Sequence, residues 1–140
     1  MIEYSYKTIH SLRHAKNRKL YNKFVIEGKR IIESALVCNE NIGTILCSDS
    51  FLKENNPWVQ KHLKKGTIIK AINKKTLLKI SSTKSPQGIL TICNIPKQNP
   101  IKLTMDKWIY LDKISDPGNM GTLIRSCAWF GIKNIALSPK

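Results

Sequence analysis

The segment DPGNMGTLIRSCAWFG, residues 116–131, carries side chains that could hold an anion or an oxyanion. Asp116 or Asn119 can cap the start of a helix, where exposed backbone N–H groups favour negative charge. Arg125 follows one to two helical turns later, and its side chain is expected to lean back towards that start. The pattern predicts a site in which amide donors, Asn119 and Arg125 meet a phosphate or a ribose. The competing interpretation is that the glycines serve only turn and packing, with Arg125 an ordinary surface residue.

The two faces of this expected helix differ in the size of their side chains. One face is apolar at helical spacing and is expected to pack on a sheet; its residues are Met120, Leu123, Ile124 and Cys127. The opposite face is mostly small; its residues are Gly118, Gly121, Thr122, Arg125 and Trp129. Small residues on an outward face allow a ligand, another backbone or a second subunit to approach closely.

Two known glycine motifs are alternatives for GNMG, residues 118–121. A dinucleotide-binding loop needs G-x-G-x-x-G, so this segment supports a Rossmann site poorly. The G-x-x-G loop of a KH domain clamps nucleic-acid backbone, but it joins two helices. Residues 108–112, WIYLD, are expected to form a strand, which puts the KH interpretation in second place.

The elements around the motif are expected to form one β-α-β unit. A helix over about residues 120–130 lies between the strand in WIYLD and a further strand in NIAL, residues 134–137. Gly131 is expected to end the helix in a left-handed conformation. A lone β-α-β unit leaves both faces of its strands poorly covered, so this domain is expected to be incomplete.

A linker is expected at residues 97–106, which contain Pro100 and show no clear period. It separates a domain over residues 1–96 from the unit over residues 107–140. In the first domain, strands are expected in KFVIEG, IGTILC, GTIIKAI and QGILTIC. A short basic helix that runs into a loop is expected in KTIHSLRHAKNRKLYNK. Further helices are expected around Ile31 to Leu36, after Pro57 and after an Asn73 cap. Because strands and helices alternate, parallel pairing within an α/β domain is predicted.

Positive charge runs along the whole chain of 140 residues, whose formal net charge is +15. Polyanions are the natural partners of such a chain, and nucleic acid comes first among them. An AT-rich coding bias, which enriches lysine, isoleucine and asparagine, is the alternative explanation. Arginine is rare, and its retention at Arg13, Arg18, Arg30 and Arg125 indicates a demand for bidentate donation.

The cysteines lie in apolar runs without a C-x-x-C pair, so buried free thiols are expected. They are Cys38, Cys47, Cys93 and Cys127. No apolar run approaches the ~18 residues needed to cross a bilayer, and the start MIEYSYKTIH has no apolar signal region. The chain is therefore expected in the reducing cytoplasm, with no membrane partner.

Two parts of the sequence resemble the SpoU, or TrmH-like, RNA 2′-O-ribose methyltransferases of the SPOUT superfamily. The run LDKISDPGNMGTLIRSCAWFGI is similar to the first sequence motif of that family. The runs KNRKLYNKFVIEGKRIIESAL and SSTKSPQGIL resemble its small substrate-binding domain. Four residues match an R…F-x-x-E-G pattern of that domain: Arg18, Glu27, Gly28 and Lys29. The resemblance implies an α/β fold, with a small αβα RNA-binding module similar to a ribosomal protein and then the start of a SPOUT α/β-knot domain, truncated before the knot.

The resemblance also implies transfer of a methyl group from S-adenosylmethionine to a ribose 2′-hydroxyl, in ribosomal more than in transfer RNA. It implies that Arg125 is the catalytic arginine, that Asn119 acts beside it, that no metal is needed and that the complete enzyme is a homodimer. The family's second and third motifs, which form the cofactor pocket, are not found in these 140 residues. No cofactor-binding residue is therefore expected within this chain, and the chain alone is expected to be inactive. A non-catalytic RNA-binding module is the alternative function.

Cations in and near the substrate-binding module are the expected contacts to RNA phosphates. They are Arg13, Lys16, Arg18, Lys19, Lys23, Lys29 and Lys84. The cluster as a whole carries this expectation, because a single surface lysine is commonly just solvated. Glu27 and Gly28 have a second interpretation, in which they only close the first strand. His10 and His14 are four residues apart on the expected helix but lack a third ligand in register, so no metal site is expected.

Overall fold

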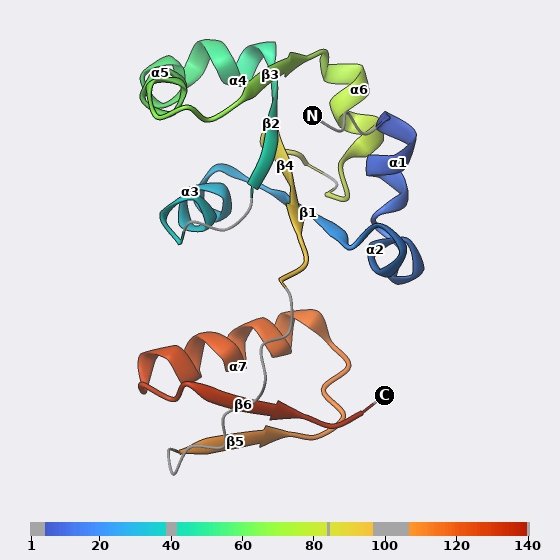
Figure 1. Ribbon diagram of the computed structural model, residues 1–140, viewed down its shortest axis with the longest axis vertical. Helices are drawn as coiled ribbons and strands as arrows, with labels where there is room; N and C mark the ends of the chain where they lie inside the picture. Colours follow the sequence, from blue (N-terminus) through green and yellow to red (C-terminus); the bar gives the residue numbers. More distant parts are fainter. Residues whose placement is uncertain (1–4, 39–41, 84, 97–106, 140) are drawn as a thin grey trace. The chain divides into compact units, whose positions relative to one another are not determined.

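The computed structural model describes residues 5–38, 42–83, 85–96 and 107–139. The chain divides into two compact units, residues 1–97 and 98–140 (Figure 1). The linker expected at residues 97–106 lies outside the described residues.

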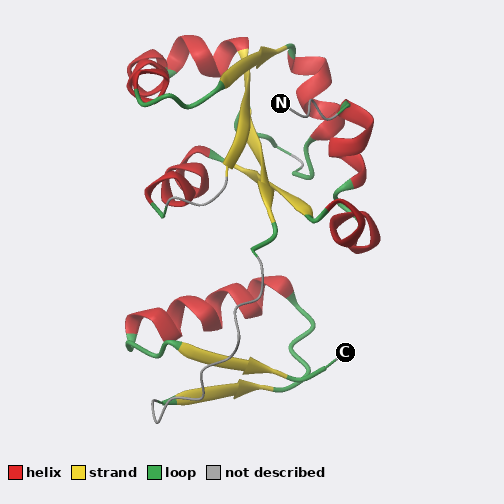
Figure 2. Ribbon diagram, viewed as in Figure 1, coloured by secondary structure: helices red, strands yellow, loops and turns green. Residues whose placement is uncertain are grey.

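The first unit is a four-stranded sheet with helices on both faces (Figure 2). Its strands are β1 (Lys23–Glu27), β2 (Ile42–Ser48), β3 (Ile69–Ile72) and β4 (Ile89–Asn94). Its helices are α1 (Tyr6–Ser11), α2 (Ala15–Tyr21), α3 (Lys29–Val37), α4 (Asp49–Glu54), α5 (Asn56–Lys64) and α6 (Lys74–Ile80). The strands are ordered β1-β4-β2-β3 across the sheet.

The strand directions differ from the sequence prediction. β4 lies between β1 and β2 and runs antiparallel to both, whereas β2 and β3 are parallel. The predicted parallel pairing is therefore correct for one pair and wrong for the two pairs that contain β4. A helix between two strands makes them parallel only if it returns the chain to the edge of the sheet where the first strand began. The chain after α6 does not return to that edge, so β4 runs in the opposite direction between β1 and β2.

Alternating side chains of the central strands build a hydrophobic core on each face of the sheet. Ile45 and Cys47 of β2 join the core under α3, α4 and α5, while Leu46 between them joins the core under α1 and α6. The first core contains the buried residues Ile32, Ile45, Cys47, Phe51, Trp58, Val59 and Ile89. The second core contains the buried residues Ile9, Leu46, Ile72, Leu77, Ile80 and Leu90.

Local signals account for most helix boundaries of the first unit. Asn73 caps α6 as predicted, because its Oδ1 accepts a hydrogen bond from the Thr76 N–H at 2.7 Å. The predicted first helix is instead two helices, α1 and α2, with His14 at the N-cap of the second, so His10 and His14 do not share a helix. The sequence did not predict α4, because a helix of 6 residues is too short to show a helical period.

The four cysteines are thiols that differ in burial. Cys47, Cys93 and Cys127 are buried as expected, whereas Cys38 is exposed, because it caps the carboxyl end of α3. Burial raises the pKa of the Cys47 thiol to about 12, so this thiol packs the core and is not a nucleophile. Among the described helices, none has both the length and the apolar character of a membrane span.

The second unit contains β5 (Trp108–Leu111), α7 (Pro117–Trp129) and β6 (Asn134–Leu137). Its two strands are parallel, which confirms the predicted β-α-β unit. Gly131 has a φ of +68° and follows the helix, as expected for a left-handed stop. α7 begins three residues before the predicted start, because Asp116 caps it and Pro117 suits the first turn.

The predicted apolar stripe of α7 is only partly buried. Cys127 is buried, Met120 and Leu123 are half-buried, and Ile124 is 48% exposed. Two strands form a narrower surface than the stripe, so the sheet covers the positions at its centre and leaves Ile124 uncovered. Trp129, at the end of the helix, is 84% exposed.

Candidate functional site

The carboxylate of Glu27 holds the segment that follows α6. Its Oε1 accepts a hydrogen bond from the Ser82 backbone N–H at 2.6 Å, and its Oε2 accepts one from the Ser81 hydroxyl at 2.6 Å. The Thr83 hydroxyl donates to the same Oε2 at 3.3 Å. Residues 81–88, SSTKSPQG, connect α6 to β4, and we call them the Glu27 segment. Glu27 ends β1, so these charge-assisted hydrogen bonds fix the start of this segment to the edge of the sheet.

Gly28 and Gln87 fix the other end of the same segment. Gly28 has a φ of +100°, and a Cβ there would come 3.1 Å from Gln87 Oε1. That Oε1 accepts a hydrogen bond from the Lys29 backbone N–H at 3.2 Å, at the start of α3. Glu27 and Gly28 therefore have a clear structural role, which is to shape the segment between α6 and β4.

Two of the arginines expected at phosphates also fix helices of the first unit. Arg13 donates from Nη2 to the Ser81 carbonyl at 3.2 Å, which ties the turn after α1 to the end of α6. Arg18 donates from Nη1 to the Leu12 carbonyl at 3.2 Å and to the Arg13 carbonyl at 2.7 Å. Arg13 is exposed and a guanidinium has five N–H donors, so Arg13 keeps donors for a ligand. Arg18 is half-buried and mainly caps the end of α1.

The expected lysines fall into different surroundings. Lys23 is the first residue of β1, and its Nζ donates a hydrogen bond to Asn94 Oδ1. Lys29 is the first residue of α3, and its Nζ donates to Asn55 Oδ1 at 2.9 Å. Lys23 lies ~13 Å from Glu27 along the strand, at ~3.3 Å per residue, so the structure does not bring it to the Glu27 segment.

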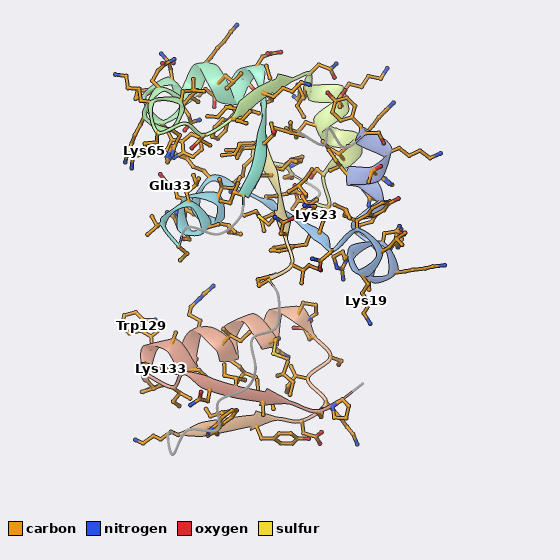
Figure 3. All side chains as sticks on the ribbon, viewed as in Figure 1. Lys19, Lys23, Glu33, Lys65, Trp129 and Lys133 are labelled. Carbon is orange, nitrogen blue, oxygen red and sulfur yellow. The ribbon has the colours of Figure 1, made fainter. Side chains whose placement is uncertain are left out.

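Lys16 and Lys19 of α2 are exposed and have no hydrogen-bond or ion-pair partner among the described residues. Figure 3 shows Lys19 reaching away from the sheet. Lys84 lies outside the described residues. Of the seven expected cations, Arg13, Lys16 and Lys19 therefore remain the best placed for an external ligand.

Carboxylates divide unevenly between the helices of the first unit. α1, α2 and α6, with the turn before α2, contain no aspartate or glutamate, and we call them the basic side. Their cations are Lys7, Arg13, Lys16, Arg18, Lys19, Lys74, Lys75 and Lys79. On the other face, α3 carries Glu33 and α4 carries Asp49 and Glu54, whereas α5 carries lysines and no carboxylate. We call α3, α4 and α5 together the mixed side, because both signs of charge occur there. Figure 3 shows Lys19 on one side of the sheet and Glu33 and Lys65 on the other.

Two features of this surface were not predicted. The net charge does not show that carboxylates are confined to helices on one face of the sheet, although the sequence shows it once each helix is assigned to a face. Gln87 and Asn94 were missed as partners of Lys29 and Lys23, because only the return of β4 beside β1 brings them together.

A buried histidine lies on the mixed side. His62 is 7% exposed, its ring centroid lies 4.3 Å from that of Trp58, and its Nε2 has no hydrogen-bond partner among the described residues. Burial lowers the pKa of His62, and the positive charges of Lys61 and Lys65 lower it further, while Glu33 opposes this shift. The residue is a packing group of the core and is far from the basic side of the sheet.

The motif helix α7 starts at the carboxyl ends of β5 and β6. Asp116 Oδ2 accepts a hydrogen bond from the Asn119 N–H at 2.7 Å, so Asp116 is the cap. A Cβ at Gly118 would come 3.0 Å from that Oδ2, so glycine leaves the cap undisturbed. The Lys113 N–H donates to Ser138 Oγ at 2.8 Å and joins the segments after the two strands. A strand precedes this G-x-x-G segment, so the KH interpretation is wrong.

The expected catalytic residues, Asn119 and Arg125, are both exposed on α7. Arg125 has no hydrogen-bond or ion-pair partner among the described residues. A Cβ at Gly121 would meet no heavy atom within 4 Å, so this glycine is not required by the packing of the unit and the face around it is open. S-adenosylmethionine, which the resemblance implies, needs an enclosing pocket. The described residues around Gly121 form an open surface and do not hold that cofactor by themselves.

Comparison with known proteins gives a family and relatives. The model for the MRM3-like substrate binding domain matches residues 5–91. The 23S rRNA (guanosine(2553)-2'-O)-methyltransferase RlmP of Bacillus subtilis is 28% identical over 122 residues, which are 87% of this chain and 46% of that protein. The mitochondrial rRNA methyltransferase 3 of Xenopus tropicalis is 28% identical over 140 residues, which are 94% of this chain and 33% of that protein. The chain thus spans about half the length, or less, of these curated relatives.

Solved structures match through both units. An AdoMet-bound rRNA methyltransferase from Sinorhizobium meliloti has a TM-score of 0.74 and 25% identity, over 96% of this chain and 51% of that one. The SpoU methyltransferase AviRb from Streptomyces viridochromogenes, in complex with AdoMet, has a TM-score of 0.79 over 97% of this chain and 53% of that one. AviRb is 19% identical, so this second likeness shows the fold alone. The α/β fold is therefore shared with about half of each of these chains.

Proposed function

We propose, because the chain belongs to the MRM3-like substrate binding domain family, that it binds ribosomal RNA for 2′-O-ribose methylation. Residues 1–97 are the RNA-binding unit, and residues 98–140 carry the first motif of a SpoU/TrmH-type catalytic domain. Relatives that are rRNA methyltransferases support this proposal. S-adenosylmethionine as methyl donor, a homodimeric enzyme and a cytoplasmic location belong to the same proposal.

The observation that carries the proposal is the basic side beside the Glu27 segment. Arg13 connects the two, because it lies in the turn between α1 and α2, and its guanidinium donates to the Ser81 carbonyl of the Glu27 segment. Neither α1 nor α2 carries a carboxylate. A phosphate backbone that approaches α1 and α2 therefore meets cations on two helices that carry no carboxylate. Lys16 and Lys19 have free ammonium groups there, and each cation that contacts a phosphate releases a counterion.

The Glu27 segment fixes the position of Arg13. Glu27 occupies the Ser81 hydroxyl and the Ser82 N–H, so these groups serve the fold. The Arg13 guanidinium is bonded to the Ser81 carbonyl of this segment, so its position on the basic side is fixed. Fixed cations position a nucleic-acid backbone, whereas sequence is read by contacts to the bases.

For the methyl-transfer chemistry we propose that Arg125 contacts the target nucleotide and that Asn119 assists it. A ribose hydroxyl that is being alkylated loses its proton, so negative charge develops on its oxygen. A fixed guanidinium and the donors at the start of α7 stabilise such charge. Arg125 has no partner among the described residues that would compete for this role, and the open face at Gly121 leaves room for the nucleotide.

The salt dependence of RNA binding tests the RNA-binding part of the proposal. Anisotropy titration of the full chain with a fluorescent fragment of 23S ribosomal RNA is expected to show an affinity that falls at least tenfold between about 50 and 200 mM KCl. Transfer RNA is expected to bind more weakly. An affinity that does not change with salt would contradict phosphate contacts and overturn the proposal.

Arg125→Ala tests the catalytic part, in the protein purified from its native source and assayed for methyl transfer to ribosomal RNA. Transfer is expected to be lost while RNA affinity stays within about tenfold, roughly 1.4 kcal/mol. Thr122→Ala on the same helix is the matched control and is expected to retain transfer. Unchanged transfer in Arg125→Ala would remove the role given to Arg125. RNA binding without transfer in the unaltered protein would favour the non-catalytic RNA-binding module.

A further inference from the structure

A groove of about 280 Å³ runs between α1 and α6 on the basic side of the first unit. Tyr6, Lys7 and His10 line it from α1, and Thr76, Lys79 and Ile80 line it from α6. This volume lies near the lower end of the range, about 300 Å³, of pockets that hold small organic groups. None of the cations expected at phosphates from the sequence lines this groove.

The packing beneath the groove fixes the spacing of its two helices. Ile9 of α1 is buried in the same core as Leu77 and Ile80 of α6, so the helices are held against the sheet and against each other. The Arg13 guanidinium bonded to the Ser81 carbonyl closes one end of the pair at 3.2 Å. The groove is therefore part of the folded unit and not a gap between mobile elements, and it leads towards the Glu27 segment.

The lining combines an aromatic ring with positive charge. Tyr6 is 46% exposed, and its hydroxyl has no hydrogen-bond partner among the described residues. Lys7 and Lys79 are exposed on the two helices that border the ring, and neither helix contains a carboxylate. An exposed aromatic ring beside cations is the combination that holds single-stranded nucleic acid, because bases stack on the ring and phosphates contact the cations.

A small neutral ligand or an acidic peptide fits these features less well. The described lining of the groove includes no buried polar group that would orient a small molecule, and its exposed lysines suit a flexible polyanion. Tyr6 lies ~8 Å from Ser11 along the axis of α1, at ~1.5 Å per residue, and Arg13 follows in the next turn, so one strand can reach both ends of the helix.

We propose that this groove binds an unpaired nucleotide of the RNA, with its base stacked on Tyr6 and its flanking phosphates at Lys7 and Lys79. His10 completes the wall of the groove beside the ribose. The inference rests on the proposed function, since it gives the RNA-binding unit a contact that the Glu27 segment and α7 do not supply. It also predicts that the unit prefers single-stranded RNA to duplex RNA at this site, because a paired base is not free to stack on Tyr6.

The test compares two probes on the full chain, a fluorescein-labelled single-stranded oligouridine and an RNA duplex of equal length. Tyr6→Ala is expected to weaken oligouridine binding about tenfold and duplex binding less than about twofold, while Tyr6→Phe keeps both affinities. Lys79→Ala is expected to weaken oligouridine binding about threefold and to reduce the salt slope by about 0.7. Lys64→Ala is the matched control, because Lys64 is likewise an exposed lysine in the last turn of its helix, on the mixed side.

The outcomes separate this proposal from the proposed function. Failure of the unaltered chain to bind either probe or ribosomal RNA would overturn the proposed function and the groove with it. A second outcome would overturn the groove alone. In it, the unaltered chain binds with salt dependence, but Tyr6→Ala and Lys79→Ala bind oligouridine as tightly as Lys64→Ala does. Circular dichroism checks folding, and if Tyr6→Ala does not fold, Lys79→Ala against Lys64→Ala decides the question.

Discussion

The two faces of the four-stranded sheet in the first unit have similar cores and different charges. Each face carries its own cluster of buried apolar residues. The helices on both faces also carry lysines, but among the six helices only α3 and α4, on one face, carry carboxylates. Folding requires apolar residues on the inward stripe of each helix and makes no demand on the sign of the outward charges. The face that carries α1, α2 and α6, whose helices have no carboxylate, is therefore the one we propose for RNA.

Truncation of the two cores is expected to give the largest effects, equal on the two sides. Ile45→Ala and Leu90→Ala remove fully buried side chains from opposite faces of the sheet, and each is expected to lower the free energy of unfolding by about 2–5 kcal/mol. Urea denaturation measures both. Ile31→Ala, at an exposed position of α3, is the control, with a loss below about 0.5 kcal/mol. A loss below 1 kcal/mol at only one of the buried positions would break the equivalence of the two cores.

Charge reversal is expected to separate the two sides. Lys16→Glu with Lys19→Glu on α2 is expected to weaken ribosomal RNA binding at least about thirtyfold, roughly 2 kcal/mol, because phosphates then meet carboxylates. Lys53→Glu with Lys64→Glu on the mixed side changes the net charge equally, and its loss is expected to stay below about threefold. Anisotropy titration at one salt concentration compares the pairs. Equal losses in the two pairs would show that only net charge matters.

The carboxylates of Glu27 and Glu33 give a smaller contrast. Glu27 accepts three hydrogen bonds from residues 81–83, whereas Glu33 accepts one from Trp58 Nε1 at 2.7 Å. Glu27→Gln is expected to lower the free energy of unfolding by about 1–3 kcal/mol and Glu33→Gln by about 1 kcal/mol or less. Urea denaturation gives the energies, and faster amide exchange at Ser82 in Glu27→Gln shows where the loss occurs. A larger loss in Glu33→Gln would contradict the role given to Glu27.

The smallest effect is expected from pH at His62. Its pKa is lower in the folded chain than the ordinary value of 6.5, so the folded state binds fewer protons than the unfolded state below that pH. Stability from this residue is complete above about pH 6.5 and is lost as the pH falls towards the lowered pKa. His62→Phe keeps the ring contact with Trp58 and is expected to lose less stability than the unaltered chain between about pH 7 and 5. Identical pH profiles would contradict a buried neutral His62.

The fold could be predicted where short-range signals are strong. The Asn73 cap and the Gly131 stop placed helix ends correctly, and the pattern of residues 108–137 predicted the β-α-β unit. The SpoU/TrmH resemblance is confirmed by the family match over residues 5–91 and by the shared fold. The insertion of β4 between β1 and β2 could not be predicted, because strand order depends on contacts between residues far apart in sequence.

The site was predicted by residue type more than by contact. Arg13, Lys16 and Lys19 lie where an external ligand can reach them. Arg18, Lys23 and Lys29 are instead used by the fold, as bonds to the Leu12 carbonyl, to Asn94 and to Asn55 show. Sequence cannot distinguish these cases, because the acceptors come from other elements. The roles of Arg125 and Asn119 remain predictions.

Hydrogen exchange on the full chain tests the claim that the basic side is the RNA-binding surface. Mass spectrometry with and without a ribosomal RNA fragment compares residues 5–21 and 74–83 with residues 49–64. Exchange is predicted to slow in the first two segments, which carry α1, α2 and α6, and to stay unchanged in the third, which carries α4 and α5. Slowing confined to residues 49–64, with RNA bound, would contradict the claim.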